Sequence, residues 1–141
     1  MNFLSLLQAL FLIAYMQNIS LIGTWKIESY DAIDKIRQSP TYITGDAYSR
    51  EMIERQIDEI LSKGEYIFSN DTLRYTDLQN NKLVYRKAIW KIEGDILKII
   101  EIDRPYEREA YVHNLNADTL IISPIIDGIV GDSKIVFSKS N

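Results

Sequence analysis

Most of the chain after Gly23 consists of short segments in which apolar and polar residues alternate, with turn-forming residues between them. Alternation places every second side chain on the same face, as in a β-strand with one buried face. Short connections do not allow a parallel crossover, so neighbouring strands should pair antiparallel in chain order. The sequence therefore predicts an all-β domain of about eight strands. These strands are residues 23–31, 65–69, 72–77, 83–92, 96–103, 108–114, 119–125 and 133–138.

Residues 49–63 depart from this pattern and predict an amphipathic helix between the first and second strands. Ser49 or Asp46 supplies an N-cap, and Gly64 follows the last turn as a C′ glycine. Residues 32–45 are polar and contain Pro and Gly, so we expect an irregular connection there. Four apolar residues recur at the spacing of one helix face: Ile53, Ile57, Ile60 and Leu61.

A meander of this length leaves two exposed edges unless it closes on itself. We therefore expect an eight-stranded antiparallel up-and-down barrel over residues 21–141, with a two-sheet sandwich as the alternative. The predicted helix would lie across or cap one opening. A barrel of eight strands can be filled by its own side chains or can hold one small ligand. Periodicity does not separate these two interiors.

Residues 1–20 contain no charged residue. Their apolar run has the length of a signal-peptide core and is short for a membrane span, which needs about 20 residues. We expect a signal peptide, a periplasmic or secreted barrel, and no stable membrane span after processing. One alternative is an apolar N-terminal helix that packs on the domain. Another is an uncleaved segment that associates with the membrane.

The composition excludes several classes of function. The chain has no cysteine, which excludes disulfides, thiolate zinc sites and a cysteine nucleophile. A net charge of -4 argues against nucleic-acid binding. The sequence shows no hydrolase, zinc-protease, phosphate-loop or dinucleotide motif. We therefore expect a monomer that is not an enzyme and has no cofactor or metal.

Two groups of polar residues remain as candidates for chemistry. His113 is the single histidine, and its place in a strand favours a surface or pocket-lining role over catalysis. The second group could contain a carboxylate pair for glycoside chemistry, but a solvated hairpin tip with compensating arginines is the preferred interpretation. Its members are Glu101, Asp103, Arg104, Glu107, Arg108 and Glu109.

Gly23-Thr24-Trp25 opens the first strand, and Ile135-Val136-Phe137-Ser138-Lys139 ends the last one. With the meander between them, these residues resemble the lipocalins and their calycin relatives, above all the small exported bacterial lipocalin-like domain proteins. The resemblance covers residues 21–141. It implies that Trp25 closes one end of the barrel, that Gly23 permits close packing there, and that Lys139, or alternatively Lys134, packs across the indole. A cation over an indole contributes roughly 0.5–2 kcal/mol.

The inner faces of the strands are rich in aromatic residues, which suit an apolar ligand with a polar end. We therefore predict an exported, non-enzymatic binding protein for a small apolar or amphipathic ligand. The alternative is a filled barrel that acts through its surface as a protein-interaction or inhibitor module. The volume of the interior distinguishes them. The predicted ligand-binding residues are Ile27, Tyr66, Phe68, Tyr75, Trp90 and Ile122.

Overall fold

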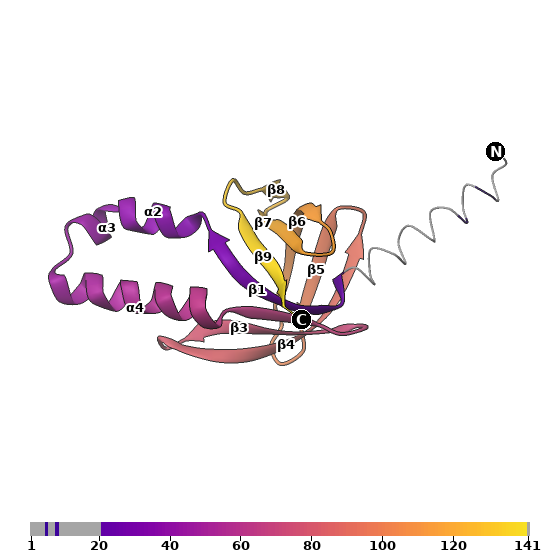
Figure 1. Ribbon diagram of the computed structural model, residues 1–141, viewed down its shortest axis with the longest axis horizontal. Helices are drawn as coiled ribbons and strands as arrows, with labels where there is room; N and C mark the ends of the chain where they lie inside the picture. Colours follow the sequence, from indigo (N-terminus) through magenta and orange to yellow (C-terminus); the bar gives the residue numbers. More distant parts are fainter. Residues whose placement is uncertain (1–4, 6–7, 9–20, 141) are drawn as a thin grey trace.

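A ring of antiparallel strands carries a group of helices that projects from one end, as Figure 1 shows. The computed structural model describes residues 5, 8 and 21–140. The ring consists of β1 (Gly23–Tyr30), β2 (Glu65–Phe68), β3 (Thr72–Gln79), β4 (Lys82–Glu93), β5 (Ile96–Glu101), β6 (Glu107–Leu115), β7 (Thr119–Ile126) and β9 (Ile135–Ser140).

Each strand pairs antiparallel with its neighbour, and β9 pairs with both β7 and β1. Since β6 also pairs with β7, the ring is closed and has no free edge. The short β8 (Ile129–Val130) pairs with β7 outside the ring. The predicted eight-stranded antiparallel barrel is confirmed, and the sandwich alternative is excluded.

Two tight turns show how local residue choice sets the register. Asn80 and Asn81 join β3 to β4 with φ of 52° and 63°. Asp127 and Gly128 join β7 to β8 with φ of 52° and 75°. Positive φ at both central positions matches the right-handed twist of paired strands, and Asn, Asp and Gly adopt it most readily.

Three helices lie between β1 and β2: α2 (Ala32–Gln38), α3 (Pro40–Ile43) and α4 (Ala47–Lys63). The predicted helix is confirmed as α4, with Asp46 as its N-cap accepting a hydrogen bond from the Ser49 amide at 2.7 Å. The prediction of an irregular connection over residues 32–45 is wrong, because that segment contains α2 and α3. We call residues 32–63 the helical arm.

Contacts between the helices of the arm explain why this polar segment is helical. Ser39 caps α3 by accepting a hydrogen bond from the Tyr42 amide. Arg37 donates two hydrogen bonds to Glu54 on α4, at 2.9 and 2.8 Å, and the Tyr42 hydroxyl donates a third at 2.8 Å. These bonds hold the pKa of Glu54 down at about 2. The arm is therefore organised by pairing between α4 and the two shorter helices.

Gly64 ends α4 for a reason that differs from the prediction. Its φ of -66° is ordinary, so it is not the left-handed C′ glycine expected from the sequence. A Cβ at this position would instead lie 2.2 Å from the carbonyl oxygen of Ile60 and 2.7 Å from Cδ1 of Ile27. Glycine therefore allows the end of α4 to lie directly against β1.

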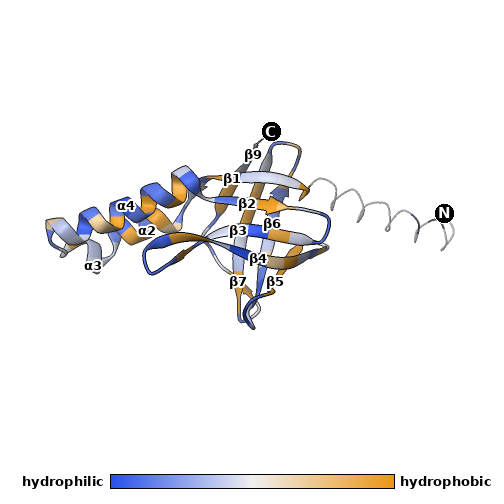
Figure 2. Cartoon of the chain, turned by 90° about the horizontal axis from the view of Figure 1, so that it is seen from below, coloured by the Kyte–Doolittle hydropathy of each residue, from blue (hydrophilic) through white to orange (hydrophobic). Residues whose placement is uncertain are grey.

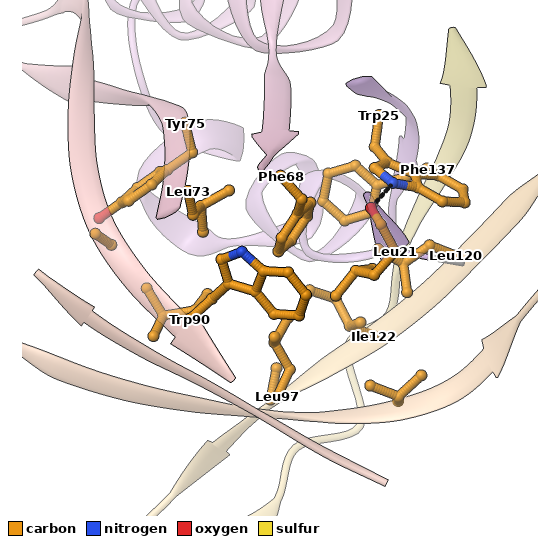
Figure 3. Close-up of a cluster of buried hydrophobic side chains, with 14 residues drawn as sticks. Leu21, Trp25, Phe68, Leu73, Tyr75, Trp90, Leu97, Leu120, Ile122 and Phe137 are labelled. Atoms are coloured by element: carbon orange, nitrogen blue, oxygen red, sulfur yellow. Dashed lines mark hydrogen bonds between the residues drawn. The ribbon is translucent and has the colours of Figure 1, made fainter. Parts of the chain in front are cut away.

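The inner faces of the strands meet in one hydrophobic core, which Figure 3 shows in close-up. Hydrophobic and hydrophilic residues alternate along the strands (Figure 2), and in β5 every second residue is buried. The largest fully buried apolar side chains are Trp25, Tyr75, Phe68, Phe137, Leu21, Leu73, Leu97 and Leu120. Within the described residues, no helix is long and apolar enough to cross a membrane. The predicted signal peptide, residues 1–20, lies outside the described residues except for Ser5 and Gln8.

Candidate ligand-binding site

The two ends of the barrel differ in what fills them. The closed end is the one at which β1 begins, with Gly23 opposite Phe68 of β2. The mouth is the opposite end, where β1 ends at Tyr30 and β2 begins at Glu65. Because the helical arm connects those two strand ends, it is attached at the mouth (Figure 1).

Trp25 fills the closed end and is fully buried. Its indole Nε1 donates a hydrogen bond to the Leu21 carbonyl oxygen at 2.8 Å, drawn as a dashed line in Figure 3. The ammonium of Lys139 lies 5.3 Å from the centre of the ring system. Gly23 has a φ of 136°, and a Cβ there would lie 2.8 Å from Cε of Lys139. Lys134 lies near the mouth instead, beside Asp31.

Four of the six predicted ligand-binding residues lie in the packed core, because Phe68, Tyr75, Trp90 and Ile122 are each at most 4% exposed. The rings of Phe68 and Trp90 meet edge to face with centres 5.2 Å apart. The Trp90 indole donates a hydrogen bond to the Ser69 carbonyl oxygen at 2.8 Å. These contacts are those of a filled interior, with aromatic edges against faces and satisfied polar atoms.

The two remaining predicted residues, Ile27 and Tyr66, line two cavities at the mouth, and Ile122 borders one of these from the core. The smaller cavity, of about 140 Å³, runs past Ile99, Ala110 and Ile122 into the barrel. The larger, of about 260 Å³, lies between β1, the β3–β4 hairpin and Ile60 of α4. Both cavities share the same four lining residues, so they adjoin: Tyr30, Tyr66, Arg108 and Ile135.

A layer of charged residues lies beside these cavities, with Asp77 and Arg108 in their walls. Glu101 is at its centre, and its side chain is fully buried. It accepts hydrogen bonds from Nε and Nη2 of Arg104 and from the Tyr75 hydroxyl. The bonds from Arg104 and then Tyr75 hold the pKa of Glu101 below its ordinary value, although burial acts in the opposite direction. Burial, together with the bond to Glu101, raises the pKa of Tyr75.

A second carboxylate completes the layer. Asp77 lies 3.4 Å from Nε of Arg86 and 3.3 Å from Nη2 of Arg104. Arg86 also lies 3.7 Å from Asp103. Buried or half-buried charges are tolerated when they are paired and hydrogen-bonded in this way. The layer is therefore a connected network rather than a set of separate surface ion pairs.

The interpretation of this group as a solvated hairpin tip is wrong for Glu101. On β5, Leu97, Ile99 and Glu101 all face the inside of the barrel. On β6, Arg108 faces the inside together with Ala110 and Val112. This alternation is visible in the sequence and could have placed both charges inside the barrel. The clustering of unlike charges concealed it, because such clusters are usually exposed.

His113 lies on the outer face of β6, exposed to solvent. Its Nε2 is 2.8 Å from the hydroxyl of Ser123, which is fully buried. Across the part of the chain that the structure describes, no group of three or more His, Asp or Glu side chains is arranged to hold a metal ion. The charged layer at the mouth is therefore the main polar feature of the barrel interior.

A closed eight-stranded barrel with cavities at one end and a packed aromatic plug at the other defines a ligand-binding type of fold. A family model described as a lipocalin-like domain matches residues 21–122. The chain belongs to this lipocalin-like family, whose members are generally not enzymes.

Two solved structures share the fold at low sequence identity. A lipocalin-like protein from Bacteroides uniformis superposes with a TM-score of 0.54 and 15% identity, covering 86% of this chain and 99% of that one. An uncharacterized protein from Bacteroides eggerthii superposes with a TM-score of 0.51 and 13% identity, covering 84% of this chain and 98% of that one. No curated protein matches the chain.

Proposed function

We propose that this protein is an exported, non-enzymatic binding protein that holds a small apolar or amphipathic molecule at the mouth of its barrel. The observation that carries the proposal is the pair of adjoining cavities, with largely apolar walls and a charged layer to one side. Apolar walls with a few placed polar groups are the usual composition of a small-molecule site. Each cavity is smaller than the roughly 300 Å³ typical of such sites, so the ligand would occupy both.

Binding of an uncharged fluorescent probe, N-phenyl-1-naphthylamine, tests the proposal. The wild-type protein should enhance the fluorescence of the probe in a saturable way. Ala110→Phe should weaken this binding, because Ala110 faces the smaller cavity and a phenyl ring would fill much of it. Ile100→Phe is the matched control, since Ile100 lies on the outer face of the neighbouring strand. The proposal fails if the wild type does not bind, or if both variants bind as the wild type does.

Export is proposed on the uncharged leader, residues 1–20. Intact mass and N-terminal sequence of the protein purified from its own cells test it. A mature chain that begins near residue 21 would support export, and a full-length chain in the soluble cytoplasmic fraction would contradict it.

The second candidate function is a protein-interaction or inhibitor module that acts through the surface of the barrel. It is favoured by apolar side chains exposed on the β7–β8 hairpin, where Ile126 is 66% and Ile129 71% exposed. Scattered exposed apolar residues are common, so this observation is weaker than the cavities. If the probe does not bind, loss of a co-purifying protein on Ile129→Ser substitution would support this alternative.

A further inference from the structure

Arg108 differs from the other two arginines of the charged layer in how its charge is compensated. Arg104 donates hydrogen bonds to Glu101 and Asp77, and Arg86 pairs with Asp77 and donates to Gln79. Among the residues that the structure describes, Arg108 approaches a carboxylate only at Glu101, with its Nη2 3.6 Å from Oε1. That distance is too long for a hydrogen bond.

The donors of Arg108 that lack partners lie on one edge of its guanidinium. Nε and Nη2 are both buried, and within residues 21–140 neither has a hydrogen-bond partner. These two N–H groups point the same way and form the planar fork that matches the two oxygens of a carboxylate. Buried donors without partners are uncommon and costly, so an unfilled fork on a side chain that lines two cavities indicates a missing acceptor.

Neighbouring rings hold the guanidinium in place. Its carbon lies 4.9 Å from the centre of the Tyr75 ring and 5.8 Å from that of Tyr106. Tyr75 is itself fixed by its hydrogen bond to Glu101. Arg108 is therefore positioned by its surroundings before any ligand arrives, which lowers the entropy lost on binding.

The other acids near the cavities do not compensate Arg108. Asp77 lines the larger cavity but is engaged by Arg86 and Arg104. Glu109 borders the smaller cavity, yet it is directly opposite Lys98 in the β5–β6 pairing, and the two lie on the outer face. The positive charge of Arg108 therefore faces both cavities with only partial compensation from Glu101.

We infer that Arg108 binds the carboxylate of an amphipathic ligand whose apolar body occupies the cavity lined by Ile99, Ala110 and Ile122. Arg108 borders that cavity and the larger one. This inference rests on the proposed function and adds the chemical class of the ligand, a carboxylic acid with an aliphatic chain. A charged group paired in a half-buried site contributes more than it would in open solvent.

Two probes of equal chain length, octanoate and 1-octanol, separate the inference from the proposed function. The measurement is displacement of N-phenyl-1-naphthylamine at pH 7. The wild type should bind octanoate at least about tenfold more tightly than 1-octanol, since two charge-assisted hydrogen bonds form with octanoate alone. Equal affinities would overturn the inference while leaving the proposed function intact. If neither probe nor the dye binds, both fail.

Variants of the arginine test the assignment to this residue. Arg108→Gln should bring octanoate to the affinity of 1-octanol and leave 1-octanol unchanged. Arg108→Lys should retain only part of the preference, because an ammonium lacks the fork. The matched control is Arg74→Gln: Arg74 is an exposed arginine that also lies against a tyrosine, with its guanidinium carbon 3.9 Å from the centre of the Tyr85 ring. The assignment would be overturned if Arg108→Gln kept the full preference for octanoate over 1-octanol, or if Arg74→Gln lost it.

Discussion

The closed end and the mouth of this barrel are built from the same eight strands, yet their interiors have opposite character. At the closed end, aromatic and aliphatic side chains fill the space, and the indole of Trp25 is hydrogen-bonded to the backbone. At the mouth, inward positions carry Glu101 and Arg108, and cavities remain beside them. Apolar side chains pack by shape, whereas buried charged side chains need particular hydrogen-bonding partners. The comparison predicts that stability resides mainly at the closed end, and it places the proposed binding at the mouth.

The largest expected effect contrasts two neighbouring positions on one face of β2. Phe68→Ala should lower the free energy of unfolding by about 3–5 kcal/mol, because Phe68 is 1% exposed and packs against Trp90. Tyr66→Ala should cost about half of that or less, since Tyr66 is half-buried and already borders both cavities. Urea denaturation measures both. Equal losses of unfolding free energy in the two variants would contradict the proposed difference between the closed end and the mouth.

Glu101→Gln tests whether the charged layer contributes to stability as a paired network. The substitution leaves Arg104 and Arg108 beside a neutral amide and should cost about 3 kcal/mol at pH 7. Glu107→Gln is the control, because Glu107 is an exposed glutamate that follows on β6. A loss no larger than that of the control would show that the network does not stabilise the fold.

The same carboxylate predicts a pH dependence. The pKa of Glu101 is lowered in the folded protein, so its contribution is complete above the unfolded value, about 4.3, and is lost as pH falls toward the lower folded value. The wild type should therefore lose more stability than Glu101→Gln between about pH 5 and pH 2. Urea denaturation across this range measures the difference. Parallel losses in the two proteins would contradict the assignment.

A smaller effect is expected from Gly23→Ala at the closed end. The substitution should lower the free energy of unfolding by about 1–3 kcal/mol, because Gly23 has a φ of 136° and the added Cβ would lie against Cε of Lys139. Gly94→Ala is the matched control, because Gly94 also has a positive φ, 60°, but has open space around its Cα. Thermal unfolding of the two variants separates the combined strain and crowding at Gly23 from the milder left-handed angle at Gly94. If Gly94→Ala is equally destabilising, the backbone angle alone explains the requirement for glycine.

The smallest effect concerns the contact between Lys139 and Trp25. Lys139→Met keeps the length of the side chain and removes its charge, so it should cost about 0.5–1 kcal/mol. Lys139→Arg should be close to neutral, because a guanidinium also lies favourably over an indole. Urea denaturation followed by tryptophan fluorescence measures both. A larger loss for Lys139→Arg than for Lys139→Met would show that space, not charge, governs this position.

Much of this fold could be predicted from residues that are close in the sequence. Alternation defined the strands, and the apolar spacing over residues 49–63 defined α4. The helices at residues 32–43 were missed because their stabilising partner, Glu54, lies farther along the chain on α4. Local propensity is a weak guide where contacts across the arm decide the conformation.

The candidate site, like the fold, could be predicted only in part from residues that are close in the sequence. An aromatic lining could be read from alternation, but whether each aromatic residue packs or borders a cavity depends on the rings opposite it. Tyr66 and Phe68 share one face of β2, and only closure of the barrel places the first beside Arg108 and the second against Trp90.

The sequence by itself determined the barrel and its strand order, because alternation and turn chemistry act over a few residues. The resemblance to the lipocalins implied which residues lie at the closed end. The tertiary structure decided where the barrel is hollow. Glu101, Arg104 and Arg108 are clustered in the chain as surface charges usually are, although alternation puts Glu101 and Arg108 on inward faces. The pairing of β5 with β6 and the approach of Tyr75 from β3 then bury Glu101. Charges that are close in sequence become an interior network when a third strand excludes water from them.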